Sequence, residues 1–177
     1  MSILKRIVIS GGPATGKTSL IYGLQKQGYS CFHEVSREII REQLEANSGI
    51  LPWQNLTAFS ELVFEGRKSQ FLAAFHSSSF YDRSLIDTLA YMVKDGLPIP
   101  EHWLADVQDH RYDNPIFITP PWKEIFANDH ERRESWEQVL HIHEFLMSSY
   151  AQYGYDVVLV PKVTVEERIE FILSHVE

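Results

Sequence analysis

Eight residues near the N-terminus have the types and the spacing that suit a phosphate chain. They are Gly11-Gly12-Pro13-Ala14-Thr15-Gly16-Lys17-Thr18. The apolar run Ile7-Val8-Ile9 precedes them and a helical pattern follows from Ser19, which is the context in which G-x-x-x-x-G-K-[ST] has meaning. Glycines let backbone N–H groups approach phosphate oxygens, and the N-terminus of the next helix favours an anion. We therefore predict that residues 11–19 bind phosphates, with a plain glycine turn as the alternative.

Three side chains could supply the remaining chemistry of phosphoryl transfer. Lys17 would reach the outer phosphates as a point charge, and the Thr18 hydroxyl would be a ligand for Mg²⁺. Asp82 ends a short apolar segment, where an acidic side chain could hold Mg²⁺ through water or could position an acceptor hydroxyl. These residues predict a metal-assisted reaction of a nucleoside triphosphate.

Charged residues follow two of the expected strands. Arg83, next to Asp82, could bind an acceptor or the transferred group through paired hydrogen bonds. The alternative is a strand-end ion pair, which contributes little when it is exposed. Glu34 and Arg37 follow another strand and offer the same choice of roles. Asp87 is a candidate acceptor contact, although it could also only cap a helix.

A charged stretch follows the fourth expected strand and includes Arg132 and Arg133. A small lid at about 122–135 would bring these guanidinium groups over the phosphates and exclude water. A solvated helix face is the alternative interpretation.

Five short apolar segments alternate with helical patterns. We expect strands at residues 6–10, 29–33, 79–81, 116–118 and 156–160. We expect helices at residues 17–27, 35–46, 56–76, 85–94, 101–110 and 136–152, and a last helix after Thr164. This alternation predicts an α/β domain with right-handed crossovers and a parallel sheet covered by helices on both faces. The ligand crevice then lies at the carboxyl ends of the strands, where the charged residues occur.

Two details of the helices are also predicted. Capping boxes should begin the last two helices at Ser135 and Thr164. The long helix at 56–76 should turn an apolar stripe that includes Leu62 and Leu72 toward the core.

The composition limits the classes of function. The 177 residues are 44% apolar and 12% aromatic, as expected for one globular domain with a three-layer core. A net charge of −8 without a basic run argues against nucleic acid and anionic membrane surfaces as partners. We see no signal peptide, no integral membrane segment and no second cysteine to pair with Cys31, so we expect a cytoplasmic protein.

Several motifs together resemble a known family. They are the phosphate loop, Glu34-Val-Ser-Arg37-Glu, Asp82-Arg83-Ser84-Leu-Ile-Asp87-Thr-Leu-Ala-Tyr91, Asp129-His-Glu-Arg132-Arg133, and Gly154-Tyr155 followed by Pro161. Over nearly the whole chain they look like the P-loop AAA-type domains that include the ribosylnicotinamide kinase part of the bacterial NadR protein. The resemblance implies a three-layer, nucleoside/nucleotide-kinase-like P-loop NTPase fold with parallel strand order 2-3-1-4-5.

The same resemblance implies what would bind where. ATP would lie on residues 11–18, while Glu34, Arg37 and Arg83 would contact an acceptor, and Arg132 would act from the lid. Family members differ in what they bind, so the resemblance supports nucleotide binding better than any particular acceptor.

Three classes of function are compatible with these motifs. The first is an ATP-dependent kinase that phosphorylates a small nucleoside, nucleotide or riboside-like acceptor. The second is a nucleotide-binding regulator or weak NTPase without such an acceptor. The third is a module that binds a phospholipid headgroup or a protein. It is suggested only by the resemblance of the chain to the fly Ttd14 protein, which shares this type of domain, and the acidic net charge mildly disfavours it. A GTPase switch is disfavoured because the chain has no Asn-Lys-x-Asp sequence.

Overall fold

The computed structural model describes residues 4–74, 77–127 and 134–176. The predicted lid arginines, Arg132 and Arg133, lie outside these ranges. Of the lid segment predicted at about 122–135, the described part contains a single short, exposed 3₁₀ turn at Lys123–Ile125.

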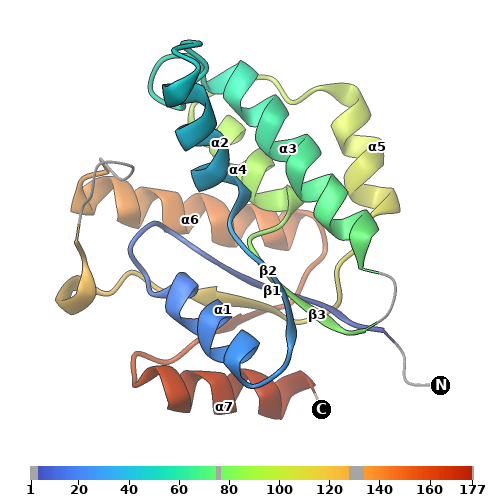
Figure 1. The fold of residues 1–177 in the computed structure, drawn as a ribbon, viewed down its shortest axis with the longest axis vertical. Coiled ribbons are helices and arrows are strands. Elements are labelled where there is room, and N and C mark those ends of the chain that lie inside the picture. Colours follow the sequence, from blue (N-terminus) through green and yellow to red (C-terminus); the bar gives the residue numbers. More distant parts are fainter. Residues whose placement is uncertain (1–3, 75–76, 128–133, 177) are drawn as a thin grey trace.

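In these ranges of the chain, five parallel strands form one sheet in the order β2-β3-β1-β4-β5, as the family resemblance implied (Figure 1). The strands are β1 (Arg6–Gly11), β2 (Ser30–Phe32), β3 (Ser79–Asp82), β4 (Ile116–Thr119) and β5 (Val157–Leu159). Every predicted strand is present, and none begins or ends more than two residues from its expected bounds. The predicted α/β fold class is confirmed.

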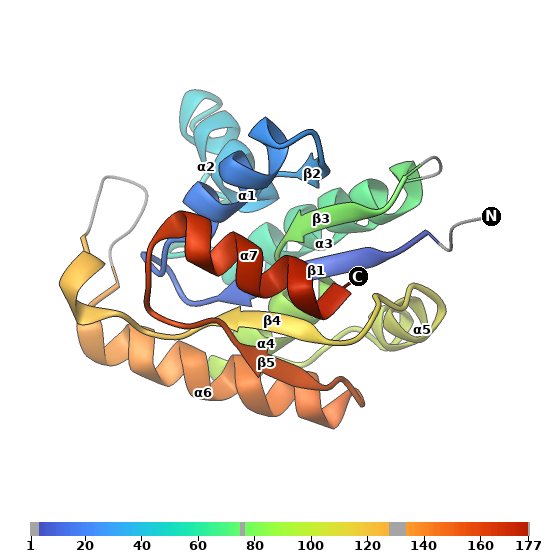
Figure 2. The same ribbon diagram turned by 90° about the horizontal axis from the view of Figure 1, so that it is seen from below.

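Within the described residues, seven α-helices connect or follow these strands. They are α1 (Lys17–Lys26), α2 (Val35–Glu45), α3 (Leu56–Ala73), α4 (Leu85–Lys94), α5 (Glu101–Asp109), α6 (Trp136–Gln152) and α7 (Val165–Val176). Helices α1 and α7 lie side by side on one face of the sheet, and α4 and α6 lie on the other (Figure 2).

Alternate residues of the strands pack on opposite faces of the sheet. Ile7 and Ile9 of β1 belong to the buried cluster that includes side chains of α1 and α7. Val8, between them, belongs to the cluster that includes side chains of α3, α4, α5 and α6. Because both faces are covered, β1 and β4 contain continuous apolar runs rather than alternating apolar and polar residues.

Local sequence signals explain where several helices begin. Ser135 and Gln138 form a capping box at α6, and Thr164 and Glu167 exchange the corresponding hydrogen bonds before α7. Both predicted caps are therefore confirmed. Each satisfies backbone N–H groups that the first helical turn leaves without partners.

The predicted apolar stripe of α3 was too wide. Leu62 is 39% exposed and Leu72 is 46% exposed, so neither reaches the core. At about 100° per residue, the buried Phe59, Val63 and Phe71 share one face of the helix, and both leucines fall outside that face. The helix buries its face against α2 on one side and α4 on the other.

A buried polar cluster joins α4 and α6 to the carboxyl end of the central strand β1. The Asp87 carboxylate is completely buried and accepts hydrogen bonds from the Ser10 hydroxyl at 2.6 Å, the Ser84 backbone N–H at 2.8 Å and the Tyr150 hydroxyl. Each carboxylate oxygen therefore has a donor, which is the condition for burying such a group at little cost. The cluster holds the N-terminus of α4 against the strand that leads into the phosphate loop.

Replacing Tyr150 by phenylalanine tests this cluster. Tyr150→Phe keeps the buried ring but removes one donor from the Asp87 carboxylate, so we expect the free energy of unfolding to fall by about 1–2 kcal/mol. Urea titration followed by circular dichroism measures the change. Tyr22→Phe is the matched control, because Tyr22 is 53% exposed, and it should change stability by less than ~0.5 kcal/mol. Equal stability of all three proteins would show that the cluster is not stabilising.

Candidate active site

The phosphate loop leaves β1 in a conformation that requires glycine. Gly11 has a φ angle of 145°, and a Cβ atom there would lie 2.1 Å from the Thr119 hydroxyl oxygen of β4. Gly16, just before α1, has a φ angle of 83°. Such angles are rare for residues with a side chain, so the fixed glycines of the motif have a direct structural cause.

Lys17 begins α1 and lies inside the loop. Its ammonium group donates a hydrogen bond to the Gly12 carbonyl oxygen at 2.6 Å, and the residue is only 7% exposed. Burial and the nearby Arg83 charge lower the pKa of Lys17 to about 7, although carboxylates of the site oppose the shift. Thr18, the next residue, is half-buried and Ser19 is exposed.

Asp82 ends β3 and lies beside Ile9 of β1 in the parallel register, two residues before the loop begins. The residue is 3% exposed, and its Oδ1 atom has no hydrogen-bond partner among the described residues. Burial, together with the neighbouring negative charge of Glu34, raises the pKa of the Asp82 carboxyl to about 6. A buried carboxylate oxygen without a donor is a natural ligand position for a cation.

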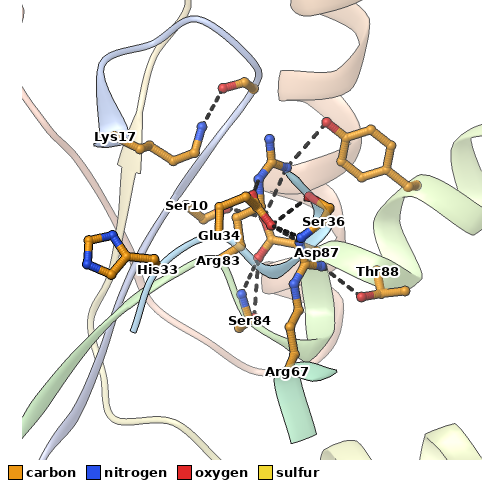
Figure 3. Close-up of polar contacts among 12 residues, drawn as sticks. Ser10, Lys17, His33, Glu34, Ser36, Arg67, Arg83, Ser84, Asp87 and Thr88 are labelled. Carbon is orange, nitrogen blue, oxygen red and sulfur yellow. Dashed lines mark hydrogen bonds and ion pairs between the residues drawn. The ribbon is translucent and has the colours of Figure 1, made fainter. Parts of the chain in front are cut away.

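The backbone of Arg83 has a conformation that residues with a side chain rarely adopt. Its φ angle is 74°, a left-handed conformation that costs about 1–2 kcal/mol for a residue with a Cβ atom. Its N–H donates to the Ile9 carbonyl oxygen at 3.0 Å, and its guanidinium forms an ion pair with the Glu34 carboxylate and donates to the Tyr91 hydroxyl at 3.3 Å. These contacts direct the guanidinium toward Glu34 (Figure 3).

Glu34 lies between two guanidinium groups at the start of α2. Besides Arg83, its carboxylate pairs with Arg67 of α3 at 2.9 Å and accepts hydrogen bonds from the Ser36 hydroxyl at 2.7 Å and backbone N–H at 3.2 Å (Figure 3). Burial alone would raise the pKa of Glu34, but the two cations and Ser36 together lower it to about 2. The group is therefore held ionised.

A hollow of about 340 Å³ opens from these side chains, and we call it the α3-side hollow. Its polar lining includes Lys17, Thr18, Glu34, Arg37, Arg67, Asp82 and Arg83. Its apolar lining includes Ile40, Pro52, Trp53, Leu56, Phe59, Val63 and Ile142. The charged end of the hollow lies at the phosphate loop, where Lys17 is surrounded by Glu34, Asp82 and Arg83. Helices α2, α3 and α6 contribute apolar side chains, and Lys94, Asp95 and Glu134 add further charges to the lining.

A second hollow, of about 430 Å³, lies on the other side of the loop, and we call it the α7-side hollow. The loop contributes residues 14–19, and the remaining lining comes from Trp122, Ile125, residues 163–165 and Arg168. The two hollows share Lys17 and Thr18. A ligand on the loop could therefore reach into both.

The structure brings most of the predicted site residues together at the carboxyl ends of the strands. Asp87 is an exception, because it is completely buried within its cap and does not line the α3-side hollow. It approaches the site only through Arg83, whose guanidinium lies 3.7 Å from its carboxylate. Arg132 belongs to the residues outside the described ranges.

Several residues that line the hollows were given no role from the sequence, among them Arg67, Tyr91, Trp53 and Arg168. Two of them carried a signal that could have been used. Arg67 and Arg168 are charged residues at buried positions of amphipathic helices, 4% and 2% exposed respectively. A charge on the apolar side of a helix indicates a buried partner or ligand.

Solved structures with a similar fold include those of a deoxyadenosine kinase and of the NadR protein. Deoxyadenosine kinase from M. mycoides with bound dATP has a TM-score of 0.69 at 15% identity, covering 97% of this chain and 98% of that one. The NadR protein in complex with NR has a TM-score of 0.69 at 21% identity, covering 98% of this chain and 50% of that one. At such identities these likenesses show the shared fold. The chain spans about half the length of NadR.

None of the curated proteins matches the chain. A family model described as an AAA domain, however, matches residues 6–168, which is nearly the whole chain. It begins with β1 and includes the phosphate loop, all the strand-end residues and Arg168. The resemblance inferred from the sequence is confirmed, and the chain belongs to the AAA domain family.

Proposed function

We propose that this protein transfers the γ-phosphate of ATP to a small acceptor held in the α3-side hollow. The observation that carries the proposal is that the two hollows meet at Lys17 and Thr18. One molecule on the α7 side and another on the α3 side would therefore place their reacting groups at the same lysine. A protein that only bound a nucleotide would need one hollow.

The donor would lie on the phosphate loop and in the α7-side hollow. Backbone N–H groups of the loop and the start of α1 favour a phosphate chain, and Lys17 supplies a positive charge beside it. Trp122, Ile125 and Val163 offer apolar surface to the nucleoside end. The role of Arg132 as a lid residue that neutralises phosphate charge stays a prediction. The cytoplasmic location of the protein also stays a prediction.

The residues also fit a magnesium ion. The Thr18 hydroxyl and the Asp82 carboxylate both line the α3-side hollow, and Asp82 has a buried oxygen without a donor among the described residues. When bound in such kinases, Mg²⁺ neutralises charge on the phosphate oxygens. Its ligands here would be Thr18 directly and Asp82, directly or through water.

The acceptor would contact the charged end of the α3-side hollow. Arg83 would neutralise charge on the group that is transferred, and Glu34, held ionised beside it, would accept a hydrogen bond from the acceptor hydroxyl. Arg37 lines the same hollow and would be a further acceptor contact. Asp87, whose carboxylate lies 3.7 Å from the Arg83 guanidinium, would support Arg83 rather than contact the acceptor.

The walls of this hollow suit a flat, partly apolar ring. Trp53, Phe59 and Val63 could bury such a ring while the charged end holds a hydroxyl or phosphate. The fold neighbours support this choice, since NadR is seen with NR and deoxyadenosine kinase with dATP. We therefore propose a nucleoside, nucleotide or riboside-like acceptor.

Acceptor-dependent ATP turnover tests the proposal. Purified protein with Mg-ATP should release ADP at least about tenfold faster with one member of a panel of nucleosides, nucleotides and ribosides than without an acceptor. Coupled detection of ADP and identification of the phosphorylated product measure this. Slow ADP release that no acceptor changes would contradict the kinase and favour a nucleotide-binding regulator or weak NTPase.

Two substitutions should separate donor binding from acceptor chemistry. Lys17→Met should weaken ATP binding about 10- to 100-fold, since a hydrogen bond to a charged group is lost. Arg83→Ala should lower acceptor-dependent turnover about 100-fold or more while ATP affinity changes less than about threefold. Calorimetric titration and steady-state kinetics on folded proteins give both quantities. Equal loss of ATP affinity in both variants would contradict the role of Arg83.

The low pKa of Glu34 predicts a pH dependence of stability. Because folding lowers this pKa from its usual 4.5 to about 2, the ion pair stabilises fully above pH 4.5, and the effect is lost as pH falls toward 2. At pH 7, Glu34→Gln should lower the free energy of unfolding by roughly 3 kcal/mol. Denaturant titrations should show this difference shrinking below pH 4.5. Exposed Glu45→Gln is the control, and a pH-independent difference would contradict the assignment.

A further inference from the structure

Arg168 is a buried cation in the first turns of α7. It is 2% exposed, yet it lines the α7-side hollow beside the phosphate loop. Its guanidinium donates to the Thr15 carbonyl oxygen at 3.1 Å and lies 5.7 Å from the centre of the Trp122 ring. Nothing in the sequence motifs assigns a role to this residue, and the proposed phosphoryl transfer does not use it.

No carboxylate of the described residues forms an ion pair with Arg168. Its Nε atom also has no hydrogen-bond partner in that part of the chain. A buried charge without a counter-charge is costly, and proteins retain such groups where an anion arrives. The nearest surface that would receive an anion is the phosphate loop, which Arg168 already contacts.

The contact with Thr15 also orients the loop. The Thr15–Gly16 peptide is trans, so its carbonyl oxygen and its N–H point in opposite directions. Because Arg168 holds the carbonyl oxygen, the Gly16 N–H is directed away from the guanidinium. A Cβ atom on Gly16 would lie 2.7 Å from an Arg168 nitrogen, so the guanidinium would have to shift from this position.

We propose that Arg168 is a positioning residue for the phosphate chain of the bound nucleotide. It fixes the orientation of the Thr15–Gly16 peptide so that the Gly16 N–H faces the phosphates. Its charge lies behind this peptide and attracts the phosphates across it, without direct contact. This inference rests on the proposed binding of a nucleotide to the loop. It assigns Arg168 to the phosphates and not to the base, although the residue lies on the nucleoside side of the loop.

Binding of ATP and of tripolyphosphate, which has no base, tests the assignment. We expect Arg168→Met to weaken binding of both ligands at least tenfold, measured by calorimetry with Mg²⁺ on protein shown to be folded by circular dichroism. Arg168→Lys keeps the charge and should weaken the affinity for both ligands less, about threefold.

Arg111→Met is the matched control. Arg111 also donates to a backbone carbonyl oxygen, that of Tyr153, and its guanidinium packs on the Tyr155 ring, but it lines neither hollow. It should bind both ligands as the wild type does.

Other outcomes identify which idea fails. If the wild type binds neither ligand, the proposed function fails. If the wild type binds both and Arg168→Met binds both equally well, only the role of Arg168 is refuted. Weakened ATP binding with unchanged tripolyphosphate binding would assign the residue to the base and overturn the proposal. If Arg168→Met does not fold, Arg168→Lys decides, since unchanged affinity for both ligands would refute the role.

Discussion

The buried ion pair between Glu34 and Arg83 is the interaction on which the site depends. Glu34 caps α2 just after β2, and Arg83 follows β3, so the pair joins the ends of two neighbouring strands. Burying either charge alone would cost several kcal/mol, because an unpaired ion loses its hydration. Arg67 supplies a second cation from α3, which ties that helix to the same carboxylate. The pair therefore positions α2 and α3, and with them the walls of the α3-side hollow.

The phosphate loop is held from both sides. Lys17 donates to the Gly12 carbonyl oxygen within the loop, while Arg168 of α7 holds the Thr15 carbonyl oxygen from outside. Gly11 passes so close to Thr119 of β4 that no side chain would fit there. A loop fixed at these points can present its N–H groups without reorganising when an anion binds, which is how a preorganised site gains its effect.

Much of the candidate site could be predicted because strand ends and loops leave local signals. The phosphate loop, Asp82, Arg83 and Glu34 all follow apolar strands, and parallel strands bring such positions to one edge. Arg67 and Arg168 could not be assigned a role in this way, because each sits on a helix, and which face meets the ligand depends on packing. Leu62 and Leu72 show the same limit, since a plausible apolar stripe extended beyond the face that α2 and α4 cover.

The sequence by itself determined the elements, their order and the glycine positions, because periodicity, caps and backbone sterics act over a few residues. It also determined the α/β class, since alternating strands and helices admit few arrangements. Only the tertiary structure decided that Glu34 pairs with both Arg67 and Arg83, that Asp87 is buried in a cap, and that two hollows meet at Lys17. These depend on residues distant along the chain, whose separation is set by packing of the whole domain rather than by local preference.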